Sequence, residues 1–198
     1  MYFKVEVEDK ELLLEEFIEQ NYQARHINIE KYINGSLQTW YISGGNCGSI
    51  ASAICMRYYY DYVSSTYVDS SKIGQNDLIS LMQSYVGSGG TTYSNMVKGI
   101  NSYLAARSVT NSVQRTSSFS FSTVKNQINS SRPIIVGTLN RGTFGDHWII
   151  AHGYFESPVD GNYIIVNNGW SNNNVWIEPD TQTLDGTIIS ANSIRSMI

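Results

Sequence analysis

The spacing of apolar residues changes from a helical period to a strand period near residue 113. In the first part of the chain, apolar residues recur every three to four positions, which is typical of amphipathic helices. This pattern predicts helices over Asp9–Gln20, Cys47–Tyr62, Gln75–Val86 and Tyr93–Ala106. Between the last two helices, the run of small residues at 87–90 predicts a loop.

The second part of the chain is predicted to form mainly strands, with a short helix over Ser122–Asn129. Apolar runs predict strands over Phe119–Phe121, Pro133–Leu139, Gly145–Tyr154, Asn162–Trp170 and Val175–Glu178. Near the start of the chain, Tyr2–Val7 also alternates like a strand. A helical half followed by a strand-rich half indicates an α+β fold.

The length and composition indicate one domain. A chain of 198 residues with 41% hydrophobic content buries most of its apolar surface in a single core. We therefore expect one domain over residues 1–198. It divides into an N-terminal strand and helix segment over 1–40, a helical half over 41–112 and a β-rich half over 113–198.

Charge and composition exclude several partner classes. The net charge of -4 disfavours nucleic acid. No run approaches the roughly 18 apolar residues of a membrane span, so none is expected. The abundance of Asn, Ser, Thr and Tyr over Lys favours a secreted or cell-surface bacterial protein, while a cytoplasmic location stays open. The oligomeric state is not indicated by the sequence.

Cys47 lies where a glycine-rich loop turns into an apolar helix. The first turn of a helix has unpaired N–H groups and the positive end of the helix dipole, which favour a thiolate. Glycines on both sides allow a sharp bend and close approach of a substrate chain, so Gly45, Asn46 and Gly48 are candidate substrate-binding residues. The alternative is that Cys47 is a small buried apolar residue.

Two predicted strands further along provide a base and an orienting group. His147 begins one strand, and Asn167 and Asn168 end the next, followed by Trp170. A cysteine nucleophile needs an imidazole to take its proton and a polar group to fix the imidazole tautomer. These residues need to be adjacent only in the fold.

The same residues resemble the papain-like cysteine peptidases. The run from His147 to Tyr154 is similar to the His-x-x-x-x-x-Gly-Tyr strand of that clan, and residues 163–170 are similar to its strand ending in Asn-Ser-Trp. The Cys-Gly-Ser start of the nucleophile helix is closer to the bacterial branches, streptopain and the double-glycine-leader peptidases. The resemblance implies a papain-like fold with the cleft between its two halves.

The papain-like register implies that Asn168 orients His147 and that Trp170 shields their hydrogen bond. A streptopain-like register selects Asn167 instead, so Asn167 stays in reserve. The resemblance also implies an oxyanion-hole glutamine, for which Gln38 is the nearest upstream candidate although it lies further from Cys47 than in papain. An ordinary loop residue is the alternative for Gln38.

The acidic N-terminal segment has two interpretations, a pro-segment of the kind common among papain-like enzymes or a solvated helix face. Asp146, which precedes His147, and Trp170 are further candidate substrate-binding residues.

The other cysteine and histidines are interpreted as structural. Cys55 is eight residues from Cys47 on one predicted helix, too far for a disulfide, and is expected in the core. Strand alternation puts His147 and His152 on opposite faces, so His152 is expected in the core or between sheets. His26 is expected to be solvated. The motifs of metal sites are missing, so no metal is expected.

The sequence thus predicts a cysteine peptidase that acts on a protein or peptide through a thioester acyl-enzyme and needs no cofactor. Two alternatives stay open. One is another acyl transfer on the same residues, by a cell-wall amidase or endopeptidase or a transglutaminase-like enzyme. The other is an inactive papain-like binding module.

Overall fold

The computed structural model describes residues 12–20, 27–116, 120–141, 144–170, 174–179 and 184–190. The predicted strand Tyr2–Val7 and the solvated histidine His26 lie outside these residues. Residues 12–20 form a helix, as the periodicity predicts, and the large apolar side chains on it are exposed.

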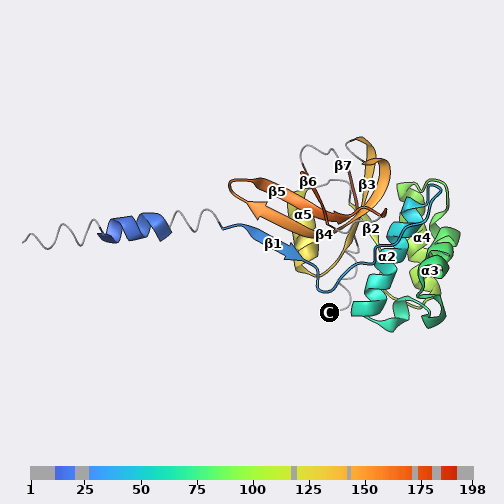
Figure 1. The fold of residues 1–198 in the computed structure, drawn as a ribbon. Helices are drawn as coiled ribbons and strands as arrows, with labels where there is room; N and C mark the ends of the chain where they lie inside the picture. The colour runs from blue at the N-terminus through green and yellow to red at the C-terminus, as the bar shows by residue number, and fades with distance from the viewer. Residues whose placement is uncertain are drawn as a thin grey trace, which may run out of the picture.

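Three helices make up the helical half: α2 (Cys47–Tyr62), α3 (Gln75–Val86) and α4 (Tyr93–Ala106), all with the predicted bounds. Figure 1 shows α2 between the sheet and the other two helices. Its side chains are buried almost all round, as this central position requires. Two short 3₁₀ turns, η1 (Ser65–Tyr67) and η2 (Ser70–Lys72), connect α2 to α3.

The other half is an antiparallel sheet with the strand order β2-β7-β3-β4-β5-β6, and β1 pairs with β4. Its strands are β1 (Ile29–Tyr32), β2 (Gln114–Thr116), β3 (Ile134–Arg141), β4 (Gly145–Ser157), β5 (Gly161–Asn167), β6 (Val175–Ile177) and β7 (Leu184–Ser190). The long central strand β4 pairs with β3 through its first half and with β1 through its second half. Helix α5 (Phe121–Asn129) packs against β4, β5 and β1.

The predicted strand Phe119–Phe121 is wrong at Ser120 and Phe121, the two of its residues that the structure describes. Phe121 is the first residue of α5, because the Ser120 side chain accepts a hydrogen bond from the Thr123 N–H and so caps a helix there. The nearest strand is β2, which ends at Thr116; residues 117–119 are outside the described part. Strands β1, β2 and β7 were not predicted from the sequence.

A continuous apolar core joins the two halves. It runs from Ile50 and Ile54 of α2 to Ile134 of β3 and Ile149 of β4, all almost fully buried. The fold is therefore the α+β, papain-like arrangement that the sequence predicts, with the start of α2 next to the start of β4. In the described part of the chain, no helix is both long and apolar enough to span a membrane.

Candidate active site

Cys47 is the first residue of α2 and is partly exposed. The preceding loop turns through Gly44 and Gly45, whose φ angles of 94° and 72° suit glycine. Asn46 does not cap the helix with its side chain; its Nδ2 donates to the Ser43 carbonyl and its Oδ1 accepts from Gln83 Nε2 of α3. The hydrogen bond with Gln83 fixes the loop to α3. The Asn46 side chain accepts no hydrogen bond from the first N–H groups of α2.

His147 lies in β4 and is 93% buried. Its Nε2 is 2.6 Å from the main-chain carbonyl oxygen of Asn168. A carbonyl only accepts hydrogen bonds, so Nε2 has the proton and Nδ1 of the neutral ring has the lone pair. Burial lowers the pKa of the His147 imidazole, and the hydrogen bond to Asn168 partly opposes this by stabilising the charged ring.

Asn168 thus contacts His147 in a different way from the one the sequence suggests. The resemblance implies that the side-chain amide of Asn168 orients the imidazole, but in the structure the main-chain carbonyl lies there. The side-chain Oδ1 of Asn168 accepts the N–H of Trp170, at 3.0 Å. Gly169, between them, has a φ of 67°, which allows the tight turn that presents the carbonyl to His147.

Asn167 joins two segments on either side of the site. Its Nδ2 donates to the main-chain carbonyl of Gln38, at 2.9 Å, and its Oδ1 accepts the N–H of Gly169, at 2.8 Å. Asn167 is almost fully buried. The segment with Gln38 is therefore held next to the turn at Asn168, although Gln38 lines neither cavity described below.

Two aromatic rings cover His147. The Trp170 ring lies with its centroid 4.4 Å from that of His147, and Phe144 lies 6.2 Å from His147 and 5.7 Å from Trp170. Trp170 is 40% exposed, so it forms part of the molecular surface over the imidazole. The shielding of a hydrogen bond, which the resemblance implies for Trp170, stays a prediction.

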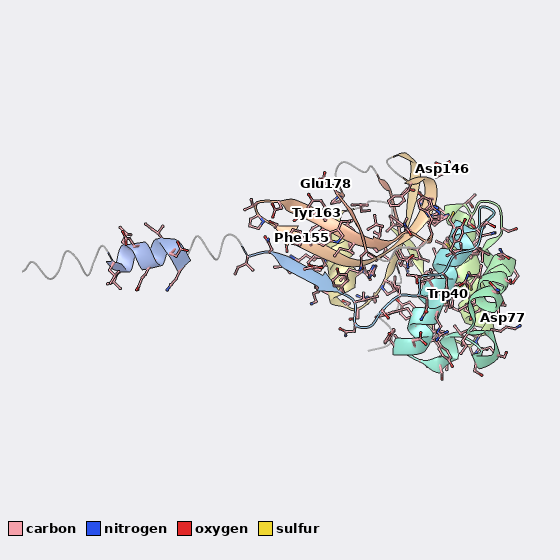
Figure 2. The ribbon with its side chains drawn as sticks, viewed as in Figure 1. Trp40, Asp77, Asp146, Phe155, Tyr163 and Glu178 are labelled. Atoms are coloured by element: carbon pink, nitrogen blue, oxygen red, sulfur yellow. The ribbon has the colours of Figure 1, made fainter. Side chains whose placement is uncertain are left out.

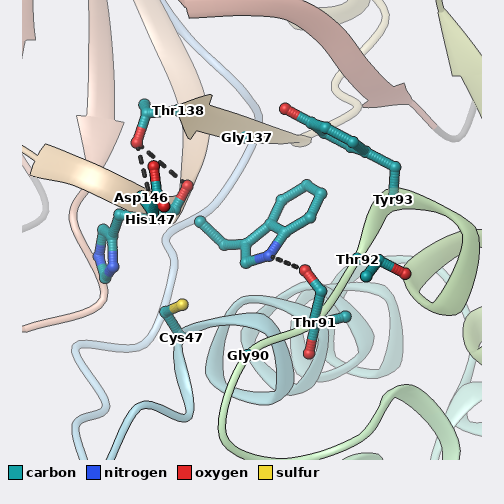
Figure 3. Close-up of a pocket in the computed structure, with 10 residues that line it drawn as sticks. Cys47, Gly90, Thr91, Thr92, Tyr93, Gly137, Thr138, Asp146 and His147 are labelled. Carbon is teal, nitrogen blue, oxygen red and sulfur yellow. Dashed lines mark hydrogen bonds between the residues drawn. The ribbon is translucent and has the colours of Figure 1, made fainter. Parts of the chain in front are cut away.

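Cys47, Asp146 and His147 line two cavities in common. The larger one, of about 440 Å³, is walled by the loop before α4 and by β3, with Thr91, Tyr93, Gly137 and Trp148. Figure 3 shows the Cys47 and His147 side chains directed into the same space. The smaller cavity, of about 170 Å³, lies on the side of the glycine-rich loop and is lined by Gly45, Asn46, Gly169 and Trp170, among others.

The wall of the larger cavity depends on close packing. The Trp148 Nε1–H donates to the Thr91 carbonyl at 2.9 Å. The Tyr93 ring lies on Gly137, so any side chain at position 137 would collide with this ring. A side chain at position 48, in place of Gly48, would likewise collide with the Thr91 side chain. Gly48 therefore serves the packing of this wall and does not itself line either cavity.

The remaining candidates have these positions. Asp146 is exposed at the end of β4 nearest the helical half, as Figure 2 shows. His152 is buried with its ring 5.7 Å from that of Tyr32, and it lines neither cavity. Cys55 is buried in α2, and burial raises the pKa of its thiol. Within the described residues, no group of three or more metal-binding side chains is suitably placed for a metal ion.

Sequence reasoning missed the residues that build the site around Cys47 and His147: Thr91, Tyr93, Thr138, Phe144 and Trp148. Thr91 directly follows the predicted loop at 87–90, and Tyr93 begins the next predicted helix. Their position beside this loop was the one signal in the sequence that could have pointed to the site. The role of Thr138 depends on strand pairing and has no signature of its own.

The fold, with a helix-terminal cysteine and a strand histidine that line one cavity, indicates a class, the papain-like cysteine peptidases. Within this class, the chain belongs to the Peptidase_C39 like family, which it matches over residues 19–186. This membership supports peptidase activity at the level of the family. Comparison with curated proteins gives no match.

Proposed function

We propose that this protein is a cysteine peptidase that cleaves a protein or peptide through a thioester on Cys47. The observation that carries the proposal is that Cys47 and His147 line one cavity, with Nε2–H of His147 engaged by the Asn168 carbonyl. This hydrogen bond leaves Nδ1 as the basic atom of the ring. A thiol at a helix N-terminus beside a basic imidazole is the arrangement that thiolate chemistry needs.

In the proposed reaction, His147 Nδ1 takes the proton of the Cys47 thiol, and the thiolate sulfur attacks the carbonyl carbon of the scissile bond. The tetrahedral intermediate collapses as His147 returns the proton to the leaving amine, and an acyl thioester remains. Water, deprotonated by His147, then attacks the thioester and releases the acid and the thiol. These steps use only side chains of this chain and water.

The Cys47 N–H, together with the Gln38 side-chain amide, is proposed to bind the oxyanion. Support for Gln38 comes from the Asn167 hydrogen bond, which fixes the main chain at Gln38 next to the Asn168 turn. Oxyanion donors of this kind contribute about 2.7–4 kcal/mol to transition-state stabilisation. Asp146, which lines both cavities, is proposed to contact the substrate, together with Trp170, Gly45 and Asn46, which line the smaller cavity.

The test is cleavage of a peptide library, with mass spectrometry of the products, by the wild type and by Cys47→Ala. Cleavage that disappears in Cys47→Ala, together with an acyl-enzyme trapped on Cys47 by acid quench, supports the proposal. Cleavage that survives in Cys47→Ala contradicts the nucleophile. Reaction of Cys47 with a peptidyl vinyl sulfone but no cleavage of any peptide favours another acyl transfer.

A further inference from the structure

The pairing of β3 with β4 is interrupted next to His147. Thr138 pairs with His147, and Arg141 pairs with Gly145, so two residues of β3 lie opposite the single residue Asp146. Gly145 has a φ of 60°, the left-handed conformation that glycine commonly supplies at bulges in a sheet. This irregularity turns Asp146 out of the ladder, where it lines both cavities.

The Thr138 hydroxyl bridges this irregularity. Its Oγ1 donates to the Gly145 carbonyl, at 2.7 Å, and accepts the N–H of His147, at 3.1 Å. Thr138 is buried, and Figure 3 shows its hydroxyl next to the main chain of Asp146 and His147. One hydroxyl thus holds the main-chain groups on both sides of Asp146.

We propose that Thr138 is a positioning residue that sets the direction of His147 and Asp146 through these two hydrogen bonds. The main chain of His147 must be fixed for its Nε2 to meet the Asn168 carbonyl and for its Nδ1 to serve Cys47. This inference rests on the proposed function, because that function assigns His147 the role of the base. Thr138 contacts the main chain of Gly145 and His147 and acts on the reaction only through the position of His147.

A purely apolar side chain cannot replace this hydroxyl. Valine has the shape of threonine, but it leaves the His147 N–H and the Gly145 carbonyl without the partner that Thr138 provides. Buried groups without partners favour local rearrangement toward water. The rearrangement is expected in the segment from Gly145 to His147, because the two hydrogen bonds end at these residues.

The chain offers matched variants. Thr138→Val removes the hydroxyl at nearly constant volume, and Thr138→Ser keeps it. Ser157→Ala is the control, because Ser157 is also buried and its hydroxyl accepts the N–H groups of Val159 and Asp160 at the opposite end of β4. Gly145→Ala strains the same irregularity without removing a hydrogen-bonding group, so it provides the test if Thr138→Val does not fold.

Two readouts separate this inference from the proposed function. The first is the rate of Cys47 alkylation by iodoacetamide as a function of pH, and the second is the NMR titration of the His147 imidazole. Cys47 and Asp146 are the titratable groups that share cavities with this ring. In Thr138→Val, alkylation at neutral pH is expected to slow by about tenfold to a hundredfold, the range for a misplaced catalytic group.

In the same variant, the pKa of His147 is expected to rise toward its ordinary value as the ring gains water. Thr138→Ser and Ser157→Ala are expected to keep both wild-type profiles. A folded Thr138→Val with the wild-type His147 titration overturns the inference, and so does an equal shift in Ser157→Ala. A wild-type protein with unreactive Cys47 contradicts the proposed function, and the His147 titration still decides the role of Thr138.

Discussion

The Nε2 atom of His147 meets the main-chain carbonyl of Asn168 at 2.6 Å, while the Asn168 side chain binds the N–H of Trp170. The group that fixes the imidazole tautomer is therefore part of the backbone. A main-chain carbonyl is present in every residue type, so this function does not require asparagine at position 168. What it requires is the turn that directs the carbonyl, which depends on Gly169 and Asn167.

The first prediction concerns the two asparagines. Asn168→Ala keeps the carbonyl and is expected to lower the turnover rate by less than about tenfold, because it loses only one neutral hydrogen bond. Asn167→Ala loses the bonds to Gln38 and Gly169 and is expected to reduce both turnover and stability, the latter by about 1–3 kcal/mol.

Rates of acylation by an active-site probe and urea unfolding measure these two effects. Asn101→Ala is the control, since Asn101 of α4 also forms one donor and one acceptor bond with a main chain, that of Val113. It is expected to lose stability but to keep the acylation rate of the folded enzyme. A larger acylation defect in Asn168→Ala than in Asn167→Ala contradicts this account.

The second prediction is selective alkylation of Cys47. Cys47 is partly exposed at two cavities, whereas Cys55 is 97% buried with a raised thiol pKa. Because the thiolate is the reacting form, native protein is expected to react with iodoacetamide at Cys47 and not at Cys55. Peptide mapping by mass spectrometry measures this, and urea-unfolded protein, in which both cysteines react, is the control. Equal labelling in the native state is incompatible with the assignment.

The third prediction is a pH dependence of stability. Burial lowers the pKa of His147 in the folded state, so the unfolded chain binds more protons as the pH falls below the ordinary histidine value of about 6.5. Stability is therefore expected to decrease as the pH falls from that value toward the lowered pKa of the folded state. Urea unfolding between about pH 7.5 and 5 measures this decrease. His147→Gln is expected to flatten the curve in that window, and an unchanged slope means that another group is responsible.

The fourth prediction tests the contact of Gly48 with Thr91. Replacing glycine by alanine inside a helix ordinarily gains about 1 kcal/mol. Here the new methyl group collides with the Thr91 side chain, and such overpacking costs about 1–3 kcal/mol, so Gly48→Ala is expected to destabilise the protein. It is also expected to weaken peptide binding, because Thr91 forms part of the larger cavity.

A double variant distinguishes this collision from a general effect on α2. Thr91→Gly removes the atoms that the new methyl group meets, so Gly48→Ala is expected to be less destabilising in the Thr91→Gly background than alone. Urea unfolding of the four proteins measures the coupling. Additive changes show that the Gly48 effect does not act through Thr91.

The helices were predictable because their signals are local. Gly74 and Thr92 stand at the N-caps of α3 and α4, and Gly87 ends α3 with a φ of 93°. Strands β1, β2 and β7 lacked such signals. The three residues of β2 become a strand only by pairing with β7, as Gln114 does with Ser190, and this long-range partner cannot be found in a short window of sequence.

The site was predictable where it depends on residue type. A cysteine at a helix start and a histidine at a strand start are visible in the sequence, and both line one cavity. The Asn168 carbonyl and the Thr138 hydroxyl were not predictable, because their roles come from the turn at Gly169 and the irregular pairing of β3 with β4. Geometry of this kind is set by tertiary contacts.

The hydrogen bond between Asn167 and Gln38 joins residues that are 129 positions apart. A ribosome adding about 5–20 residues per second needs about 5–20 s to extend the chain from Cys47 to His147, and longer to reach Asn167. During that time the emerging chain has the thiol but neither its base nor the anchor of the Gln38 segment. On the proposed function, catalysis by Cys47 therefore begins only after the β-rich half has been synthesised, so the unfinished polypeptide is not cut by its own nucleophile.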